Sequence, residues 1–284
     1  MAQQKKFLLT GASSGFGALV LEGLLKEGHV VYAVIRGGEA RIRTLRPHLT
    51  TYFGHTLWVG DFDLKERGAP ARLLEDFREK TGGRDLDSLI LNAGFGVYGP
   101  AEELPAQSLR DQMEVNFFSA VELTQLALPD LRRSKGRIIA VSSLVGRFSL
   151  PYYGAYAASK HALEGWFEAL DFEVRRHGVR VHLIEPGGFK TEFTRQSGIF
   201  ADLPAQSPYL ARFANFKKVI AASETRLGNP RRIAQLILKL SGSSWPAGLR
   251  HPRGVDAAFL RLVSRLLPDF LRRWVMRQVF RVVV

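Results

Sequence analysis

A glycine-rich turn close to the first residue limits the folds open to this chain. An apolar run at residues 5–10 leads into Gly-x-x-x-Gly-x-Gly at residues 11–17, and a helical pattern of apolar positions follows directly. A strand, a tight glycine turn and a helix in this order point the first amides of the helix at a phosphate group. Glycine permits the turn and lets a pyrophosphate approach the backbone. The segment therefore predicts a nucleotide site at the end of the first strand.

Short apolar runs alternate with helical stretches along the rest of the chain. Several runs are nearly continuous in Val, Ile and Leu, which is typical of strands buried on both faces. Strands are predicted at 5–10, 29–35, 56–60, 87–91, 137–142 and 179–185, and helices at 17–27, 66–80, 107–133, 153–177 and 230–241. This alternation predicts an α/β fold, a doubly wound Rossmann-type parallel β-sheet with helices on both faces. Residues 248–256 give only a weak signal for a seventh strand. Such a strand would suit only an edge of the sheet, because Pro252 has no backbone N–H to donate to a neighbouring strand.

Composition bears on the compartment of the chain. The sequence contains no cysteine, so it has neither a disulfide framework nor a thiol nucleophile, which suits a reducing, cytoplasmic compartment. The first residues lead straight into a strand, so no signal peptide is expected. No apolar run reaches the ~18 residues that a membrane span needs.

The net charge of +13 is concentrated in the last third of the chain. Residues 1–188 carry 23 basic and 22 acidic side chains, whereas residues 189–284 carry 17 and 5. Such a basic segment fits an anionic membrane surface or an anionic substrate, or it reflects nothing more than a basic proteome. Nucleic acid is not expected as a partner, because no nucleic-acid motif accompanies the charge.

Tyr156 and Lys160 stand four residues apart and therefore share one face of a predicted helix. A lysine ammonium beside a tyrosine favours the phenolate and lowers the pKa of the hydroxyl from its ordinary value of ~10. Ser143 precedes Tyr156 by thirteen residues. Tyrosine–lysine pairs are common on helix surfaces, so this one gains its meaning from the nucleotide turn elsewhere in the chain.

Six motifs occur in a fixed order along the chain. They are Thr10-Gly-Ala-Ser-Ser-Gly-Phe-Gly17, Asn92-Ala93-Gly94, Asn116, Ser143, Tyr156-x-x-x-Lys160 and Pro186-Gly-Gly-Phe-Lys-Thr191. Together they resemble the classical short-chain dehydrogenase/reductase family, from about residue 5 to about residue 257. The segments 95–100, 163–165 and 250–257 resemble its 17β-hydroxysteroid and retinol dehydrogenase-like branch. The resemblance implies an oxidoreductase that interconverts a carbonyl and an alcohol.

The resemblance also implies a role for each motif. Tyr156 exchanges a proton with the substrate oxygen, Lys160 holds the ribose of the cofactor, and Ser143 hydrogen-bonds the carbonyl in preference to Ser142. Asn116 positions a water beside the lysine. Cofactor contacts are expected from Gly11, Ser13, Ser14, Gly15, Phe16, Gly17, Arg36, Asp63, Leu64, Asn92, Ala93, Gly94, Tyr156, Lys160, Pro186, Gly187, Phe189 and Thr191. No metal is expected.

The end of the second predicted strand indicates which dinucleotide is bound. A site for NAD places a carboxylate there for the ribose hydroxyls, but this chain has Ile35 followed by Arg36. The planar guanidinium of an arginine suits a 2′-phosphate, so the sequence predicts NADP(H). The alternative for Arg36 is an ordinary surface arginine. Asp63 is favoured over Asp61 as the partner of the adenine amino group.

Two segments outside the motifs carry further expectations. Residues 190–228 form a long connection rich in aromatic and aliphatic side chains, predicted to be a substrate lid or, alternatively, ordinary core. From Phe259 the chain predicts two basic amphipathic helices broken at Pro268, which pack on the domain or a second subunit, or lie on a membrane. We therefore expect one domain at 1–257 and a helical extension at 258–284.

The sequence leads to one main function and two alternatives. The main expectation is NADP(H)-dependent hydride transfer on a bulky apolar substrate such as a steroid, a retinoid or a long-chain keto lipid, by an enzyme that is a homo-oligomer, expected to be a dimer. A 3-oxoacyl thioester reductase is the alternative enzyme, because basic residues would attract acyl carrier protein or coenzyme A. A non-catalytic NADP-binding regulator is disfavoured, because all four predicted catalytic residues are present.

Overall fold

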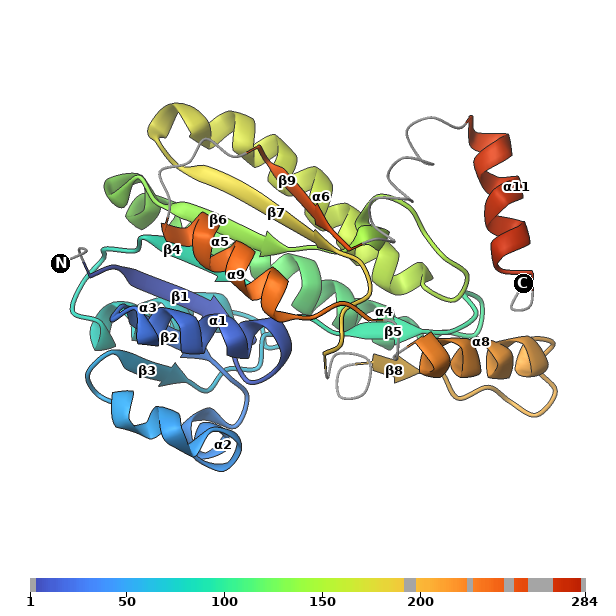
Figure 1. The fold of residues 1–284 in the computed structure, drawn as a ribbon, viewed down its shortest axis with the longest axis horizontal. Helices are drawn as coiled ribbons and strands as arrows, with labels where there is room; N and C mark the ends of the chain where they lie inside the picture. Colours follow the sequence, from blue (N-terminus) through green and yellow to red (C-terminus); the bar gives the residue numbers. More distant parts are fainter. Residues whose placement is uncertain (1–3, 192–197, 224–226, 243–247, 255–267, 282–284) are drawn as a thin grey trace.

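A seven-stranded parallel sheet forms the centre of the molecule (Figure 1). The computed structural model describes residues 4–191, 198–223, 227–242, 248–254 and 268–281. The strands of this sheet run in the order β3-β2-β1-β4-β6-β7-β9. They are β1 (Lys6–Thr10), β2 (Val30–Val34), β3 (Leu57–Gly60), β4 (Ser88–Leu91), β6 (Arg137–Val141), β7 (Arg180–Pro186) and β9 (Arg250–Arg253). The predicted Rossmann-type fold is therefore confirmed, and the six apolar runs form six of the seven strands.

The poor seventh strand also forms, and it lies where its proline is tolerated. β9 pairs in parallel with β7, with Pro252 opposite Glu185. In the order of the sheet β9 is an edge strand. Because one side of an edge strand has no ladder to complete, the missing N–H of proline costs little there.

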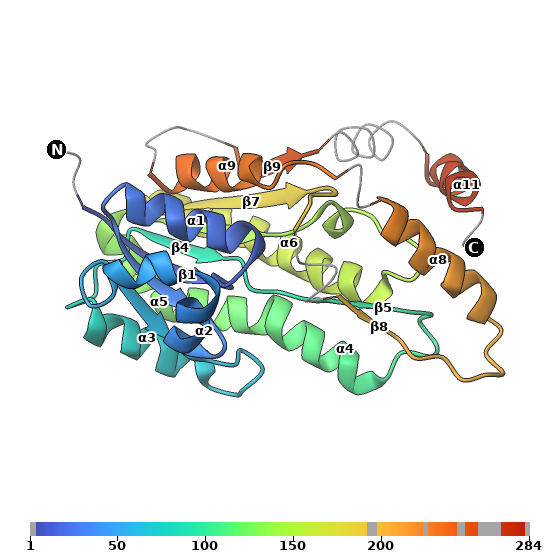
Figure 2. The ribbon, with the colours of Figure 1, turned by 60° about the horizontal axis from the view of Figure 1, so that its bottom comes forward.

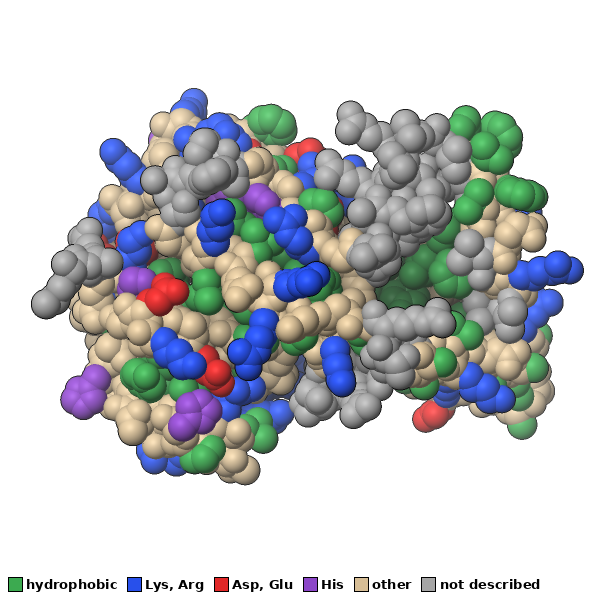
Figure 3. Space-filling view, in the orientation of Figure 1, with side chains coloured by type: hydrophobic (Ala, Val, Ile, Leu, Met, Phe, Trp, Pro, Cys, Tyr) green, Lys and Arg blue, Asp and Glu red, His purple; other side chains and the backbone are tan. Residues whose placement is uncertain are grey.

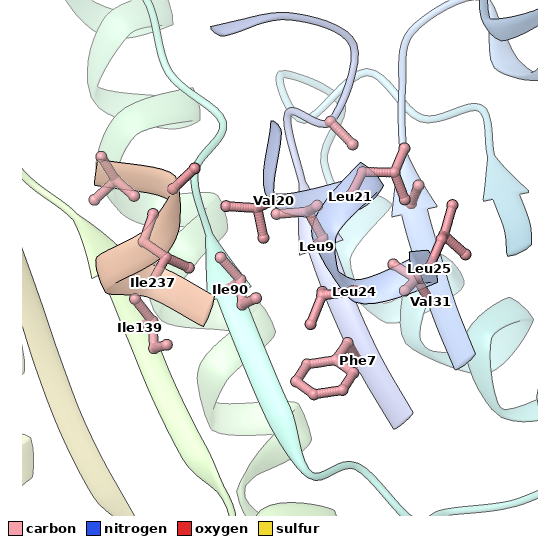
Figure 4. Close-up of a cluster of buried hydrophobic side chains, with 14 of the residues drawn as sticks. Phe7, Leu9, Val20, Leu21, Leu24, Leu25, Val31, Ile90, Ile139 and Ile237 are labelled. Atoms are coloured by element: carbon pink, nitrogen blue, oxygen red, sulfur yellow. The ribbon is translucent and has the colours of Figure 1, made fainter. Parts of the chain in front are cut away.

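Helices cover both faces of the sheet (Figures 1 and 2). α1 (Gly15–Lys26) and α9 (Arg231–Gly242) pack together on one face. The other face is covered by α3 (Ala69–Lys80), α5 (Ser119–Ser134) and α6 (Gly154–Val174). Figure 4 shows how side chains from α1 and α9 meet the sheet, in a cluster that includes Phe7, Leu9, Val20, Leu21, Leu24, Leu25, Val31, Ile90, Ile139 and Ile237. These residues are fully or almost fully buried, so α1 and α9 pack closely against this face of the sheet.

Several elements depart from the sequence prediction. The predicted helix at 107–133 is interrupted, because α4 (Ala106–Met113) passes into a π-helical turn (Glu114–Phe118) before α5 begins. The sequence analysis missed α2 (Gly38–Leu45) and a 3₁₀ turn (Pro47–Tyr52), since this polar stretch has few apolar positions to reveal a period. A separate two-stranded sheet joins β5 (Gly96–Tyr98) to β8 (Gly198–Phe200).

The predicted lid and tail are described in part. The 190–228 connection contains β8 and α8 (Leu210–Ser223). Of the two helices expected in the tail, the second forms as α11 (Asp269–Val279), directly after Pro268 as predicted. The first, from Phe259, lies outside the described residues. α8 and α11 lie at the same end of the molecule, beyond the carboxyl ends of the sheet strands (Figures 1 and 2).

Candidate active site

The glycine turn connects β1 to α1 through close backbone contacts. Gly11 and Gly15 have φ values of 68° and 55°, in the left-handed region that favours glycine. A Cβ atom on Gly11 would lie 2.8 Å from the Cα atom of Ala93. A Cβ atom on Gly17 would lie 2.2 Å from the carbonyl oxygen of Gly11, so this glycine serves the packing of α1 against the turn. At positions 11 and 17, therefore, no side chain fits between α1 and the end of β4.

Thr10 and Asn92 fasten the turn to the end of β4. The Thr10 hydroxyl accepts hydrogen bonds from the backbone N–H groups of Asn92 and Ala93, each at 3.1 Å. The Asn92 side-chain amide donates to the carbonyl oxygen of Gly11 at 2.8 Å. β1 and β4 are neighbours at the point where the strand order reverses, and ligands of doubly wound sheets bind beyond the strand ends at that point.

A cleft of about 880 Å³ opens at this point and continues to the predicted lid. Of the predicted site residues, Gly17 and Asn116 do not line it, and the remaining ones do. These are Gly11, Ser13, Ser14, Gly15, Phe16, Arg36, Asp63, Leu64, Asn92, Ala93, Gly94, Ser143, Tyr156, Lys160, Pro186, Gly187, Phe189 and Thr191. Asp61, the rival of Asp63, does not line the cleft, and its carboxylate accepts a hydrogen bond from the backbone N–H of Gly37 at 2.9 Å.

Two arginines stand at the β2 end of the cleft, where the sequence predicted one. Arg36 follows β2, and Arg41 comes from the first turns of α2. Both are exposed, and in the described part of the chain neither guanidinium forms an ion pair. Arg41 was missed because α2 was not predicted. Only that helix, which begins just after Arg36, folds Arg41 back toward the end of β2.

Ser143, Tyr156 and Lys160 come together from the end of β6 and the first turns of α6. A hydrogen bond joins the side chains of Ser143 and Tyr156. The Lys160 ammonium donates to the carbonyl oxygen of Val141 at 2.8 Å and lies 5.8 Å from the centre of the Tyr156 ring. Tyr156 and Lys160 are both buried.

The pKa values of this pair are governed mainly by burial. Burial raises the pKa of Tyr156 above its ordinary value, while the hydrogen bond with Ser143 lowers it and the neighbouring Tyr153 raises it. Burial lowers the pKa of Lys160 to about 8, and the charge of Glu164 acts in the opposite direction. The lowered tyrosine pKa expected from the lysine is therefore not found in the polypeptide itself, because desolvation of the phenol is the largest influence on this pKa. Tyr156 holds its proton at neutral pH.

Asn116 lies in the π-helical turn before α5 and faces a second, small cavity. Its side-chain amide donates to the carbonyl oxygen of Phe95 at 2.9 Å and to the Ser159 hydroxyl at 3.0 Å, and its amide oxygen accepts from the N–H of Phe95 at 3.0 Å. The cavity has a volume of about 10 Å³ and is lined by both Asn116 and Lys160. That volume is close to what a single buried water requires.

Aromatic side chains form the wall of the cleft around Tyr156. Tyr98, from β5, contacts Tyr153 and Tyr156 with ring centres 4.8 Å and 6.0 Å apart. From the predicted lid, Phe213 and Phe216 stack in parallel at 5.7 Å and belong to the same buried cluster. The 190–228 connection thus packs these aromatic residues against Tyr152 and Tyr153, in the cluster that contains Tyr156. The sequence analysis did not single out Tyr98 or Tyr153, because aromatic residues in strands and helices are ordinary core.

A charged group that the sequence analysis did not assign lies behind Lys160. Glu164, one helical turn after the lysine, is buried, and its carboxylate accepts from the guanidinium of Arg250 at 3.0 Å. The same guanidinium donates to Glu168 at 2.7 Å and lies 3.4 Å from Glu185. These contacts join the edge strand β9 to the helix that carries Tyr156 and Lys160. In the sequence, Glu164 and Arg250 lie in two of the segments that carry the family resemblance, but no role was predicted for either residue.

Comparison with known proteins agrees with this geometry. Residues 5–200 match the short chain dehydrogenase family, and the chain therefore belongs to this family of oxidoreductases. It is 32% identical to a 3-ketodihydrosphingosine reductase of Bacteroides thetaiotaomicron, covering 97% of each chain. It is 34% identical to an NADPH-dependent 3-dehydrocapnine reductase of Ornithobacterium rhinotracheale, over 84% of this chain and 82% of the relative. Retinol dehydrogenase 8 of Bos taurus is 31% identical, over 84% and 78%.

The fold has close counterparts among solved structures. A short-chain dehydrogenase from Streptomyces avermitilis superposes with a TM-score of 0.81 at 28% identity and covers 99% of both chains. The likeness to the retinol dehydrogenase branch predicted from residues 95–100, 163–165 and 250–257 is confirmed by the retinol dehydrogenase relative.

Proposed function

We propose that this chain is an NADP(H)-dependent oxidoreductase that reduces a keto group on a long-chain lipid, or oxidises the corresponding alcohol. The proposal rests above all on the buried Tyr156, which hydrogen-bonds Ser143 between a nucleotide cleft and an aromatic wall. The names of two relatives, a 3-ketodihydrosphingosine reductase and a 3-dehydrocapnine reductase, support a keto lipid over the steroids and retinoids that the sequence also allows.

NADP(H) fits the chemistry of the cleft. The glycine turn leaves room for a pyrophosphate beside Gly11, and Arg36 and Arg41 offer two guanidinium groups for a 2′-phosphate. The relative from Ornithobacterium rhinotracheale is NADPH-dependent. When bound, NADPH supplies the hydride that reaches the carbonyl carbon. Asp63 and Leu64 would hold the adenine, and Pro186, Gly187, Phe189 and Thr191 would hold the nicotinamide, because all of them line the cleft.

The residues of this chain supply the proton and the electrostatic support. Tyr156, protonated at neutral pH, donates its proton to the carbonyl oxygen as negative charge develops there. Ser143 donates a hydrogen bond to the same oxygen. The ammonium of Lys160, charged below its pKa of about 8, stabilises the phenolate that remains. The small cavity between Asn116 and Lys160 accommodates a water through which the proton is restored.

The shape of the cleft favours a lipid over an acyl thioester. Where the lid closes on Tyr156, the lining includes Leu150, Ile199 and Ile220. Among the described residues, the lid segment contributes no basic side chain to the lining, and the exposed Lys217 and Lys218 of α8 do not line the cleft. The basic residues that do line it come from outside the lid; besides Lys160, they are Arg36, Arg41, Lys65, Arg232 and Arg253. A carrier-protein reductase would need basic residues around the pocket entrance, whereas a lipid enzyme needs apolar ones.

A screen of carbonyl substrates with NADPH tests the proposal. Consumption of NADPH is measured with long-chain keto lipids, steroids, retinal and 3-oxoacyl thioesters, and the Tyr156→Phe variant serves as the control for enzyme-dependent turnover. We expect the highest kcat/KM with a long-chain keto lipid. A higher value with an acyl thioester would reverse the choice of substrate, and tight NADPH binding without turnover of any carbonyl would indicate a regulator.

We further propose a division of the chain and an assembly. Residues 1–257 form the catalytic domain with 190–228 as its lid, and 258–284 form an appended helical extension. The enzyme acts as a homodimer in the cytoplasm and makes peripheral contact with a membrane through its extension. In the described residues, no helix combines the length and the apolar character that crossing a bilayer requires.

A further inference from the structure

One face of α11 carries large aromatic side chains and arginines together. Phe270 is 74% exposed and Trp274 is 58% exposed. Arg273 and Arg277 are exposed on the same helix, and the exposed Arg281 follows its end. Their spacings of three and four residues place all five on one face. We call these five residues, Phe270, Arg273, Trp274, Arg277 and Arg281, the α11 stripe.

The α11 stripe lies beside the aromatic wall of the active site. Phe280, at the end of α11, packs against the cluster that contains Tyr98, Phe213 and Tyr156. α8 lies at the same end of the molecule (Figures 1 and 2). In the space-filling view, basic and hydrophobic side chains occur together at this end, next to a hollow with a hydrophobic wall (Figure 3). Whatever covers the stripe therefore also lies close to the lid.

α8 adds positive charge to this end of the molecule. Arg212, Lys217 and Lys218 are exposed, and residues 210–223 contain no acidic residue. The Lys217 ammonium lies 4.8 Å from the centre of the Phe213 ring, so its charge is held at the aromatic cluster. Residues 268–281 contain four arginines and one aspartate. The surface formed by the two helices is thus apolar and cationic at once.

The mixture of positive charge and apolar area on the α11 stripe distinguishes between two possible binding partners, a second copy of this chain and a lipid bilayer. A two-fold contact with a second copy would place the stripe against itself, and each arginine would then face arginines without carboxylates to pair with. Arginines flanking tryptophan and phenylalanine are instead typical of a helix that lies at the lipid interface, where the rings enter the acyl boundary and the guanidinium groups reach phosphates. An anionic bilayer satisfies both kinds of side chain.

We propose that the α11 stripe, flanked by the basic residues of α8, is a docking surface for an anionic lipid bilayer. Docking in this orientation turns the lid toward the membrane, so that a hydrophobic substrate passes from lipid into the cleft. That last consequence rests on the proposed keto lipid oxidoreductase activity, whereas docking itself does not. The binding of vesicles therefore tests the surface without reference to catalysis.

The experiment compares the full-length protein with stripe variants in vesicle co-sedimentation. Vesicles contain phosphatidylcholine alone or phosphatidylcholine with phosphatidylglycerol. We expect binding to the anionic vesicles that weakens with added salt. Phe270→Ser with Trp274→Ser, and separately Arg273→Glu with Arg277→Glu, should each lower the affinity by about tenfold or more. Emission of Trp274, taken as the difference between wild type and Trp274→Phe, should shift to the blue on binding.

Matched controls separate the α11 stripe from general surface chemistry. Phe172 is 76% exposed on α6, so Phe172→Ser removes an exposed aromatic residue elsewhere, and Arg132→Glu with Arg176→Glu reverses two exposed charges. These controls should bind vesicles as wild type does. Turnover of a small soluble carbonyl and thermal melting show that each variant is folded.

Three results would overturn the proposal. The first is a wild-type protein that does not bind anionic vesicles. The second is a set of stripe variants that bind as well as wild type. The third is a wild-type dimer that the stripe variants dissociate in size-exclusion chromatography, because the stripe would then be covered by a second copy. If the wild-type protein bound anionic vesicles but turned over no keto lipid, the proposed function would be refuted. The docking surface would be unaffected by that result.

Discussion

Replacing Arg36 with alanine is expected to weaken NADPH binding and leave NADH binding nearly unchanged. A hydrogen bond to a charged group contributes about 1.5–3 kcal/mol, which corresponds to roughly tenfold to a hundredfold in Kd. Because Arg36 is exposed, solvent and salt screen its contact with a phosphate, and the lower end of this range applies. Arg41 lines the same end of the cleft, so it shares the phosphate and limits the loss in the single variant.

The measurement is the Kd of each cofactor by titration calorimetry at two salt concentrations. We expect a loss of about tenfold for Arg36→Ala and for Arg41→Ala, with a larger loss in the double variant, all smaller at high salt. Arg43→Ala is the matched control, because Arg43 belongs to the same helix but pairs with Glu39 at 3.1 Å and does not line the cleft. Equal affinities of the unmutated protein for NADPH and NADH would refute the reasoning, as would a double variant that still prefers NADPH.

Three further predictions concern catalysis and the tail. Tyr156→Phe should leave NADPH affinity nearly intact and lower kcat by orders of magnitude in a stopped-flow assay, and retention of most activity would exclude Tyr156 as the proton donor. In the wild type, kcat/KM for reduction should fall as the pH rises through about 8, where Lys160 loses its proton. Glu164→Gln removes the charge that raises the pKa of Lys160, so the fall of kcat/KM should move to lower pH. The control variant Glu168→Gln should leave the fall at the wild-type pH. Identical pH profiles for all three proteins would contradict this prediction. Truncation before residue 259 should preserve turnover of a small soluble carbonyl while abolishing vesicle binding, and unchanged lipid binding, melting temperature and assembly would refute any role for the extension.

The sheet could be predicted from the sequence because its strands are buried on both faces. A strand such as β2 is apolar or aromatic at every position, and such runs stand out among amphipathic helices. α2 has no such signal, because only Gly38 and Ile42 in it are buried. Its absence from the prediction also hid Arg41, whose place in the cleft depends on that helix. Local pattern therefore reveals elements that face the core and misses those that lie along the rim.

The relative position of Tyr156 and Lys160 could be predicted from their spacing, but their pKa values could not. One helical turn between Tyr156 and Lys160 follows from the sequence alone. The raised pKa of Tyr156 depends on burial beside Tyr98, which belongs to β5, and beside Tyr153, which directly precedes α6. The cavity beside Asn116 depends on the π-helical turn, whose wider spacing no apolar period reveals. Desolvation is a tertiary property, so it appears only when the whole wall is assembled.

The edge strand β9 shows how the scaffold and the site depend on each other. With a proline and two arginines in four residues, β9 has little intrinsic tendency to form a strand, yet it pairs with β7. The guanidinium of Arg250 lies within 3.4 Å of three carboxylates, and two of them belong to α6. The ion pairs of Arg250 thus stabilise a strand whose own residues have little tendency to form one. The same guanidinium pairs with the buried carboxylate of Glu164 at 3.0 Å. Because the charge of Glu164 raises the pKa of Lys160, the ion pairs of β9 bear on the predicted catalytic lysine as well as on the sheet.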